Sequence, residues 1–227
     1  PTASDVTGHT ALDLWAAENN LRVQNPQRLA GVSAKLVNEG EVSFFSTLQC
    51  GSLPADFKVV TEAAQADIIL SHGIFDPLEH PEALVLCPCN LYLGLGCNRG
   101  ASAADFEVAV SELCAQYHLE RSAIAGIASI DLKADEVGLL LFARENNLPI
   151  RFYSKDELNR VEGISTSSAV MAATGARGVA EPAAMLAAGD GTTPGQLIVR
   201  KIKWKDVTAA VAEQKLPDMA KSTVSKV

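Results

Sequence analysis

The strongest constraint on the fold is a regular alternation of strand and helix patterns in the second half of the chain. The segment LYLGLGC, residues 91–97, reads as a strand that runs through a glycine-rich loop into a helix starting at Ser102. The strand AIAGIASI (123–130), a helix over 134–146 and the strand PIRFYS (149–154) follow in that order. An order β-α-β-α-β is typical of an α/β layer with a largely parallel sheet.

Further elements complete this half of the chain. Two alanine-rich helices are expected near 167–174 and 182–188, and two closing strands at 196–204 and 207–212. Ser102 and Asp105 form an S-x-x-D capping box at the start of their helix. Helical spacing places the following side chains on inward faces: Phe106, Val110, Leu113 and Tyr117 in one helix, and Val137, Leu140 and Leu141 in the next.

The first half of the chain has shorter and less regular patterns. Helices are expected around residues 11–16 and 27–37, and short strands in EVSFFS, FKVV, DIILSH and ALVLCP. We therefore predict an α/β protein of two small α/β units, residues 1–90 and 91–213, the second with a largely parallel sheet flanked by helices. Residues 214–227 are expected to be a polar, disordered tail.

Composition excludes several classes of protein. The net charge of −8 argues against binding to nucleic acid or to an anionic membrane surface. No apolar run approaches the roughly 20 residues of a membrane-spanning helix, and no signal peptide is visible, so a cytoplasmic protein is expected. The five cysteines do not form the even set of a disulfide framework. Because the first residue is proline, we expect a processed chain or a piece of a longer protein.

Metal binding is not expected either. The segment CPC at residues 87–89, downstream of His72 and His80, lacks the C-x₂₋₄-C spacing of structural zinc sites. The sequence therefore predicts no metal site built from protein ligands.

The loop after the first strand of the alternation is suited to an anion. Its glycines, Gly94, Gly96 and Gly100, have the spacing G-x-G-x-x-x-G, which differs by one residue from the dinucleotide fingerprint G-x-G-x-x-G. The helix that starts at Ser102 presents unpaired N–H groups to the loop, and Arg99 adds a planar guanidinium. The alternative is that the glycines only allow a tight turn and that Arg99 faces water.

A second basic feature lies near the end of the chain. In VRKIKWKDV, Lys201, Lys203 and Lys205 are spaced two residues apart, so a strand would place them on one face, with Ile202 and Trp204 on the other. The three ammonium groups would form a basic patch in an acidic protein. The alternative is an edge strand that lysines protect from aggregation.

Four blocks of this sequence resemble the carboxy-terminal domain of the CbiG family, the cobalt-precorrin-5A hydrolases of cobalamin biosynthesis. In order, the blocks are LGLGCNRGAS, IASIDLKADEVGLLLFA, ATGARGVAEPAAM and LIVRKIKWKDVTAAVA, within residues 92–212. Residues 1–90 resemble the middle region of that family, and PTASDVTGHTALD is similar to the last segment of its amino-terminal domain.

The resemblance implies a reaction of the anaerobic, early-cobalt route to vitamin B12. The substrate would be a cobalt-bound contracted tetrapyrrole with a ring-A δ-lactone, which the enzyme opens with release of acetaldehyde. Because this substrate carries acetate and propionate arms, a carboxylate is expected at the glycine loop rather than a phosphate. Cobalt would be carried by the substrate, so no separate cofactor is expected. Other enzymes of the corrin pathway are further candidate partners.

The sequence departs from the family pattern in two respects. It contains no S-G-H-x-G-G-A-N segment, which is typical of the family's amino-terminal domain. The loop has Asn98 where arginine is common and Ala101 where threonine is common, which removes one positive charge from the expected carboxylate site.

Lactone opening requires a base or an activated water, and carbon–carbon cleavage requires a proton shuttle. Three acids are candidates for these roles: Glu136, Asp131 and Glu181. Each also lies at an expected helix start, where a carboxylate can serve only as a cap or complement the helix dipole. Cys97 could be a nucleophile or a buried cysteine at a strand end. The expected substrate-binding residues are Gly94, Gly96, Cys97, Arg99, Gly100, Ser102, Lys133, Lys201 and Lys203.

Two other functions stay open. The chain could be a non-catalytic corrinoid-binding module whose chemistry needs an amino-terminal domain, which a turnover test with and without that domain would decide. It could also be an unrelated nucleotide-dependent enzyme, for which binding of NAD or ATP would be the sign.

Overall fold

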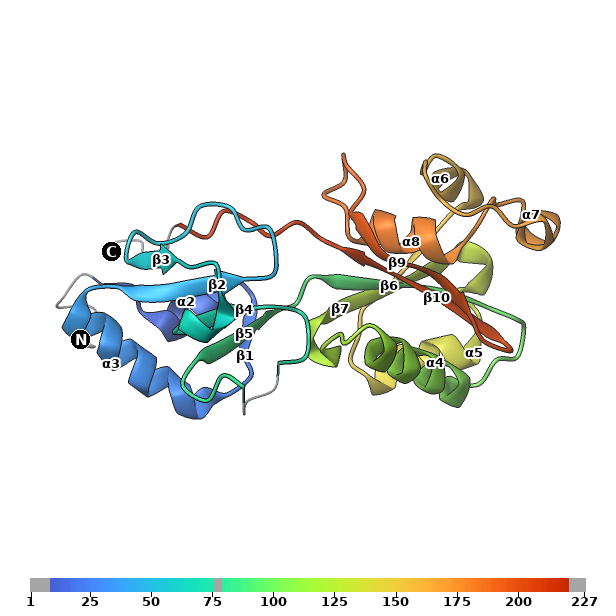
Figure 1. Ribbon diagram of the computed structural model, residues 1–227. Coiled ribbons are helices and arrows are strands. Elements are labelled where there is room, and N and C mark those ends of the chain that lie inside the picture. Colours follow the sequence, from blue (N-terminus) through green and yellow to red (C-terminus); the bar gives the residue numbers. More distant parts are fainter. Residues whose placement is uncertain (1–8, 76–78, 221–227) are drawn as a thin grey trace, which may run out of the picture. The chain divides into compact units, whose positions relative to one another are not determined.

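The chain folds into two compact units, described by a computed structural model for residues 9–75 and 79–220. Of the described residues, the first unit contains those up to Cys89 and also Leu216–Ala220, whereas the second contains Asn90–Lys215. Both units are mixed α/β structures with a five-stranded sheet, which confirms the predicted fold class (Figure 1). Within the described ranges, no helix combines the length and apolar character needed to cross a membrane.

The first unit is built on a sheet of order β1-β5-β4-β2-β3. Strands β5, β4, β2 and β3 run parallel to one another, and only β1 is antiparallel. The elements are α2 (Leu12–Glu18), β1 (Leu21–Val23), α3 (Leu29–Glu39), β2 (Val42–Ser46), β3 (Phe57–Val59), β4 (Ile68–Leu70) and β5 (Leu84–Pro88).

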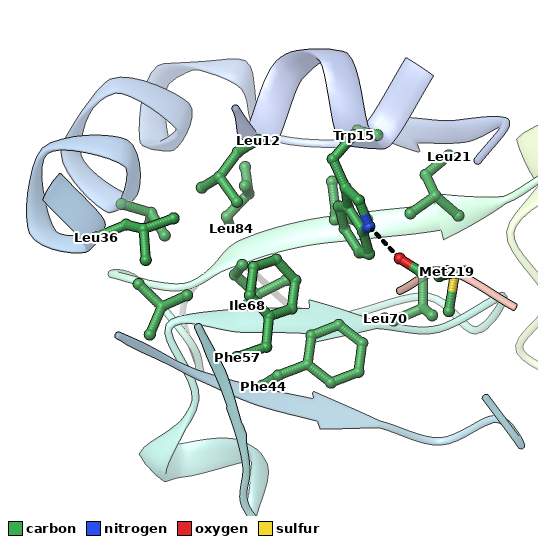
Figure 2. Packing of buried hydrophobic residues seen from close by; sticks show 14 of the residues in the cluster. Leu12, Trp15, Leu21, Leu36, Phe44, Phe57, Ile68, Leu70, Leu84 and Met219 are labelled. Atoms are coloured by element: carbon green, nitrogen blue, oxygen red, sulfur yellow. Dashed lines mark hydrogen bonds between the residues drawn. The ribbon is translucent and has the colours of Figure 1, made fainter. Parts of the chain in front are cut away.

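An aromatic cluster forms the centre of the first core (Figure 2). Trp15 packs edge-on against Phe57, with ring centroids 4.9 Å apart, and Phe44 stacks on Phe57. The indole Nε1 of Trp15 donates a hydrogen bond to the carbonyl oxygen of Met219 at 2.9 Å. The segment expected to be a polar tail is therefore partly structural, because Met219 and Leu216 are buried in this core. Residues 221–227 lie outside the described residues.

The second unit has a sheet of order β8-β7-β6-β10-β9. Strands β6, β7 and β8 are parallel, as the alternating pattern predicted, while the closing hairpin adds two antiparallel pairings. The elements are β6 (Leu91–Cys97), α4 (Ala103–Gln116), β7 (Ile124–Ile130), α5 (Val137–Glu145), β8 (Ile150–Tyr153), α6 (Lys155–Asn159), α7 (Ser168–Thr174), α8 (Ala180–Ala187), β9 (Gln196–Lys203) and β10 (Val207–Glu213).

One predicted inward face differs in the structure. Val137 and Leu140 are exposed, whereas Leu139 and Phe142 are buried. The reason is that Gly138 lies against the backbone of Ala101, so close that a β-carbon at Gly138 would overlap the Ala101 carbonyl oxygen. Because of this contact, the face of α5 that contains Gly138 is the one that packs against α4. Tyr117, at the end of α4, is likewise exposed.

Candidate functional site

A cavity of about 280 Å³ lies in the second unit, at the carboxyl end of β6. Its walls come from the end of β6, the turn between β9 and β10, the segment after β7 and helix α7. The polar, glycine and aromatic residues of the lining include Gly96, Cys97, Asn98, Lys133, Lys201, Lys203, Trp204, Lys205, Asp206, Ser167, Thr174 and Thr208.

Positive charge dominates this cavity. Four lysines line it, Lys133, Lys201, Lys203 and Lys205, against a single carboxylate, Asp206. The chain as a whole has a net charge of −8, so the cavity concentrates cations within an acidic protein. A low-dielectric concavity lined by one sign of charge focuses the field and attracts a ligand of the opposite sign. The cavity is thus suited to a ligand with several negative charges.

The two-residue spacing of Lys201, Lys203 and Lys205 predicted that these side chains share one face, and all three line the cavity. The prediction for Trp204 differs from the structure. Lys201 and Lys203 line the same cavity as Gly96 and Cys97. Trp204, expected on the opposite face, lines the cavity as well. Strand β9 ends at Lys203, so the alternation of faces no longer applies at Trp204. Strand β9 is also an edge strand, so the protective role of its lysines is compatible with the structure.

Lys133 is held in place by a buried carboxylate. Its Nζ lies 3.1 Å from Oε2 of Glu136, whose other oxygen accepts the backbone N–H of Gly100 at 2.8 Å. Burial alone would raise the pKa of Glu136, but the Gly100 hydrogen bond and Lys133 outweigh it and hold the pKa below its ordinary value. Glu136 is therefore an ionised group that positions the Lys133 ammonium at the cavity, and it is not part of the lining.

Arg99 has its partners outside the cavity. Its guanidinium donates to Asp135 at 2.5 Å and to the carbonyl oxygen of Leu132 at 2.8 Å. These contacts tie the loop after β6 to the segment after β7. Arg99 is largely exposed and is absent from the cavity lining, whereas Lys133, Lys201 and Lys203 are part of it.

Cys97 lines the cavity as a half-buried thiol. Burial raises the pKa of this thiol, and the neighbouring Lys133 lowers it by less. The thiolate is the nucleophilic form of cysteine, and this environment disfavours the thiolate. The raised pKa of Cys97 is thus compatible with a packing role at the strand end.

The other two acidic candidates also lie off the cavity lining. Glu181 is buried and accepts hydrogen bonds from the backbone N–H groups of Ser165 and Lys201, at 2.5 and 3.0 Å. Burial would raise its pKa, but these hydrogen bonds together hold the pKa below its ordinary value. The hydrogen bond from Lys201 to Glu181 therefore holds strand β9 in place at that residue. Asp131 is exposed and accepts the backbone N–H of Leu132.

The loop residues predicted to bind substrate have separate roles. A β-carbon at Gly94 would overlap the Ala180 carbonyl oxygen, so this glycine lets α8 pack directly on β6. Gly96 lines the cavity, and Gly100 adopts a left-handed φ of 82°, which favours glycine. Ser102 caps α4 through the predicted capping box with Asp105.

Sequence reasoning did not identify two of the most distinctive lining residues, Asp206 and Trp204. Asp206 accepts a hydrogen bond from the side-chain amide of Asn98 at 3.0 Å. The Trp204 indole donates to Glu112 at 2.7 Å, which fixes the ring beside the cavity. The only local signal for Asp206 was its place after Lys205 in a turn between two predicted strands.

Comparison with known families covers nearly the whole chain. Residues 91–212 match the family "Cobalamin synthesis G C-terminus", and residues 10–88 match "Cobalamin biosynthesis central region". The boundary between the two matches falls where the first compact unit gives way to the second.

Individual relatives agree with these family matches. A protein named cobalt-precorrin-5A hydrolase from Priestia megaterium is 31% identical over 93% of this chain, which spans 60% of that protein's length. Protein CobE from a Sinorhizobium species is 32% identical, over 59% of this chain and 86% of CobE. A crystal structure of CobE, described as a protein from the cobalamin (vitamin B12) biosynthetic pathway, is 29% identical. It matches with a TM-score of 0.52 over 55% of this chain and 89% of that one.

Proposed function

The chain belongs to the CbiG family of cobalamin-biosynthesis proteins, and from this premise we propose that it acts on cobalt-precorrin-5A. The reaction is the hydrolytic opening of the ring-A δ-lactone with release of acetaldehyde, which gives cobalt-precorrin-5B on the anaerobic route. The relative from Priestia megaterium supports this proposal by its name and by similarity over 93% of this chain.

The observation that carries the proposal is the lysine-lined cavity of the second unit. Four lysines and one carboxylate, Asp206, are among the lining residues, and Lys133 is paired with Glu136 behind the lining, so the lining residues carry more positive than negative charge. A contracted tetrapyrrole with acetate and propionate arms supplies several carboxylates, and hydrogen bonds between a charged donor and a carboxylate are the strong ones. Lys201 and Lys203 from β9 and Lys133 from the segment after β7 would each receive a carboxylate oxygen.

The size of the cavity limits what can enter it. Pockets that enclose most of a drug-sized ligand measure roughly 300–1,000 Å³. The cavity here is about 280 Å³, and a tetrapyrrole is larger than a typical drug molecule. We therefore propose that one edge of the macrocycle, with its carboxylate arms, occupies the cavity. Cobalt enters as part of the substrate, so no separate cofactor is included in the proposal.

The second candidate function is a corrinoid-binding module without chemistry of its own. One observation favours it: the three acids first considered for catalysis lie outside the cavity lining. This alternative shares the binding site with the first proposal and differs only in turnover.

One experiment separates the two functions. Purified chain is mixed with cobalt-precorrin-5A in the absence of oxygen, and acetaldehyde is measured through NADH oxidation by alcohol dehydrogenase. A parallel titration follows the visible spectrum of the corrinoid to measure its dissociation constant. Acetaldehyde release by the chain alone supports the hydrolase. A spectral change that saturates without acetaldehyde release supports the binding module, and no spectral change contradicts both.

A further inference from the structure

The hydrolysis proposed above needs a group that accepts a proton from water. A lactone is a cyclic ester, and a positioned base contributes roughly 10²–10⁴-fold to the rate of such a proton-transfer step. Glu136 and Glu181 are occupied by backbone N–H groups, and Asp131 faces solvent. The cavity lining is the next place to look for a base among the described residues.

Asp206 is the carboxylate among the residues that line the cavity. It lies in the turn between β9 and β10, and its side chain is 32% exposed. Its Oδ1 accepts the amide of Asn98 at 3.0 Å, and its backbone carbonyl oxygen accepts the backbone N–H of Asn98 at 2.9 Å. One residue of the loop after β6 thus holds both the backbone of this turn and one oxygen of the carboxylate.

The second oxygen of Asp206 is open to a reactant. Within residues 9–75 and 79–220, no hydrogen bond uses Oδ2, and its nearest ion-pair partner is the Nζ of Lys205 at 3.9 Å. Lys205 is almost fully exposed, so solvent screens this weak contact. A partly exposed carboxylate in the cavity lining, with one oxygen anchored and the other without a hydrogen bond among the described residues, has an arrangement that suits a general base.

We propose that Asp206 is the general base for lactone opening, an inference that rests on the proposed function. Oδ2 takes a proton from a water molecule while the water oxygen bonds to the lactone carbonyl carbon. The ring C–O bond then breaks, and the departing alkoxide takes the proton back from Asp206. The products of this step are a carboxyl group and an alcohol, so one water is consumed and Asp206 is regenerated. Acetaldehyde leaves in a following step, in which the hydroxyl loses its proton, the C–C bond between the alcohol carbon and the macrocycle breaks, and the macrocycle carbon takes up a proton. The lysine ammonium groups of the cavity stabilise the oxyanion that forms at the carbonyl oxygen.

The test compares Asp206→Asn with the wild-type chain on cobalt-precorrin-5A. Asparagine keeps an oxygen acceptor for Asn98 and removes the base, so the variant should fold. We expect its turnover number to fall about 100-fold or more. The dissociation constant should stay the same or decrease, since a negative charge is removed beside four lysines. Asp206→Glu, which restores a carboxylate, should recover part of the turnover.

A matched control is Asp156→Asn, an exposed aspartate on α6 that is absent from the cavity lining. It should keep wild-type turnover. If the wild-type chain releases acetaldehyde and Asp206→Asn does so at the same rate, the assignment of Asp206 is wrong while the proposed function stands. A comparable loss in Asp206→Asn and Asp206→Glu, with a raised dissociation constant in both, also contradicts a base and indicates a binding role. If the wild-type chain binds the substrate without turnover, the hydrolase proposal fails, and the base assignment fails with it.

Discussion

The carboxylate of Glu136 joins two loops by accepting the backbone N–H of Gly100 at 2.8 Å, 36 residues away in the sequence. The same carboxylate holds Lys133, whose ammonium group lines the cavity. Gly100 has a left-handed φ of 82°, and its position exposes the N–H to Glu136. One buried acid therefore fixes both the loop after β6 and the cation contributed by the segment after β7.

The first prediction follows from this arrangement. Glu136→Gln keeps an oxygen for Gly100 but leaves the largely buried Lys133 ammonium without its carboxylate. We expect the free energy of unfolding to fall by about 3 kcal/mol, because removing one partner of a buried ion pair leaves an uncompensated charge. Urea denaturation measures the change. Glu145→Gln, at an exposed position of the following helix, is the control, and an equal loss in both variants would contradict the role of Glu136.

The second prediction concerns the contact between α8 and β6. A β-carbon at Gly94 would overlap the Ala180 carbonyl oxygen and lie 2.7 Å from the Ala184 nitrogen. Both atoms are backbone atoms of a helix, so neither can move without displacing α8. Gly94→Ala should lower the free energy of unfolding by about 3 kcal/mol, at the upper end of the usual cost of overpacking. Gly31→Ala, on α3 with no atom within 4 Å of the added carbon, should instead be neutral or stabilising.

Local patterns predicted the parts of this structure that depend on local physics. The β-α-β-α-β order and the Ser102–Asp105 capping box follow from residues close together in the chain, and both are present. The common orientation of Lys201 and Lys203 follows from the two-residue period of a strand. These features needed no knowledge of which elements meet in space.

Contacts between distant segments could not be predicted in the same way. An acid in a first helical turn reads as a cap, and nothing near Glu181 in the sequence indicates that it binds the backbone of Lys201. Arg99 looked free for an anion because Asp135 is 36 residues away. The prediction of which face of α5 is buried was wrong, because a backbone contact between Gly138 and Ala101 sets that face and apolar periodicity does not.

The third prediction tests the return of the chain into the first unit. Met219 is fully buried against the aromatic cluster, so Met219→Ala should lower the stability of that unit by about 2–5 kcal/mol. The chain has two tryptophans, and Trp15 fluorescence in a Trp204→Phe background reports on the first unit alone. Leu14→Ala, on α2 of the same unit at a position 48% exposed, should have a small effect in the same assay. If Met219→Ala is as stable as its parent, the segment after Leu216 contributes nothing to the core.

The fourth prediction is a pH dependence caused by Glu181. Its pKa is lower in the folded chain than the ordinary value of 4.5, so its stabilisation is complete above that value and is lost as the pH falls through the folded-state pKa. Glu181→Gln should cost about 1–3 kcal/mol at neutral pH, since an amide N–H then meets backbone donors. The difference from wild type should shrink in acid, as measured by denaturation at decreasing pH. A constant difference, or the same trend in the exposed Glu162→Gln, would contradict the prediction.

The last prediction concerns Lys201 and Lys203, which lie on an edge strand and also line the cavity. If they bind the substrate's carboxylates, replacing both with glutamine should raise the dissociation constant of the corrinoid about tenfold, which corresponds to roughly 1.4 kcal/mol. The attraction is partly exposed to solvent, so salt weakens it, and the variant should show a flatter dependence on ionic strength. The matched control removes two positive charges from α6 and its end, by Lys155→Gln and Arg160→Gln, and should leave binding unchanged. If the two lysines only protect the edge strand from aggregation, the opposite result is expected: corrinoid binding is unaffected and the lysine variant aggregates.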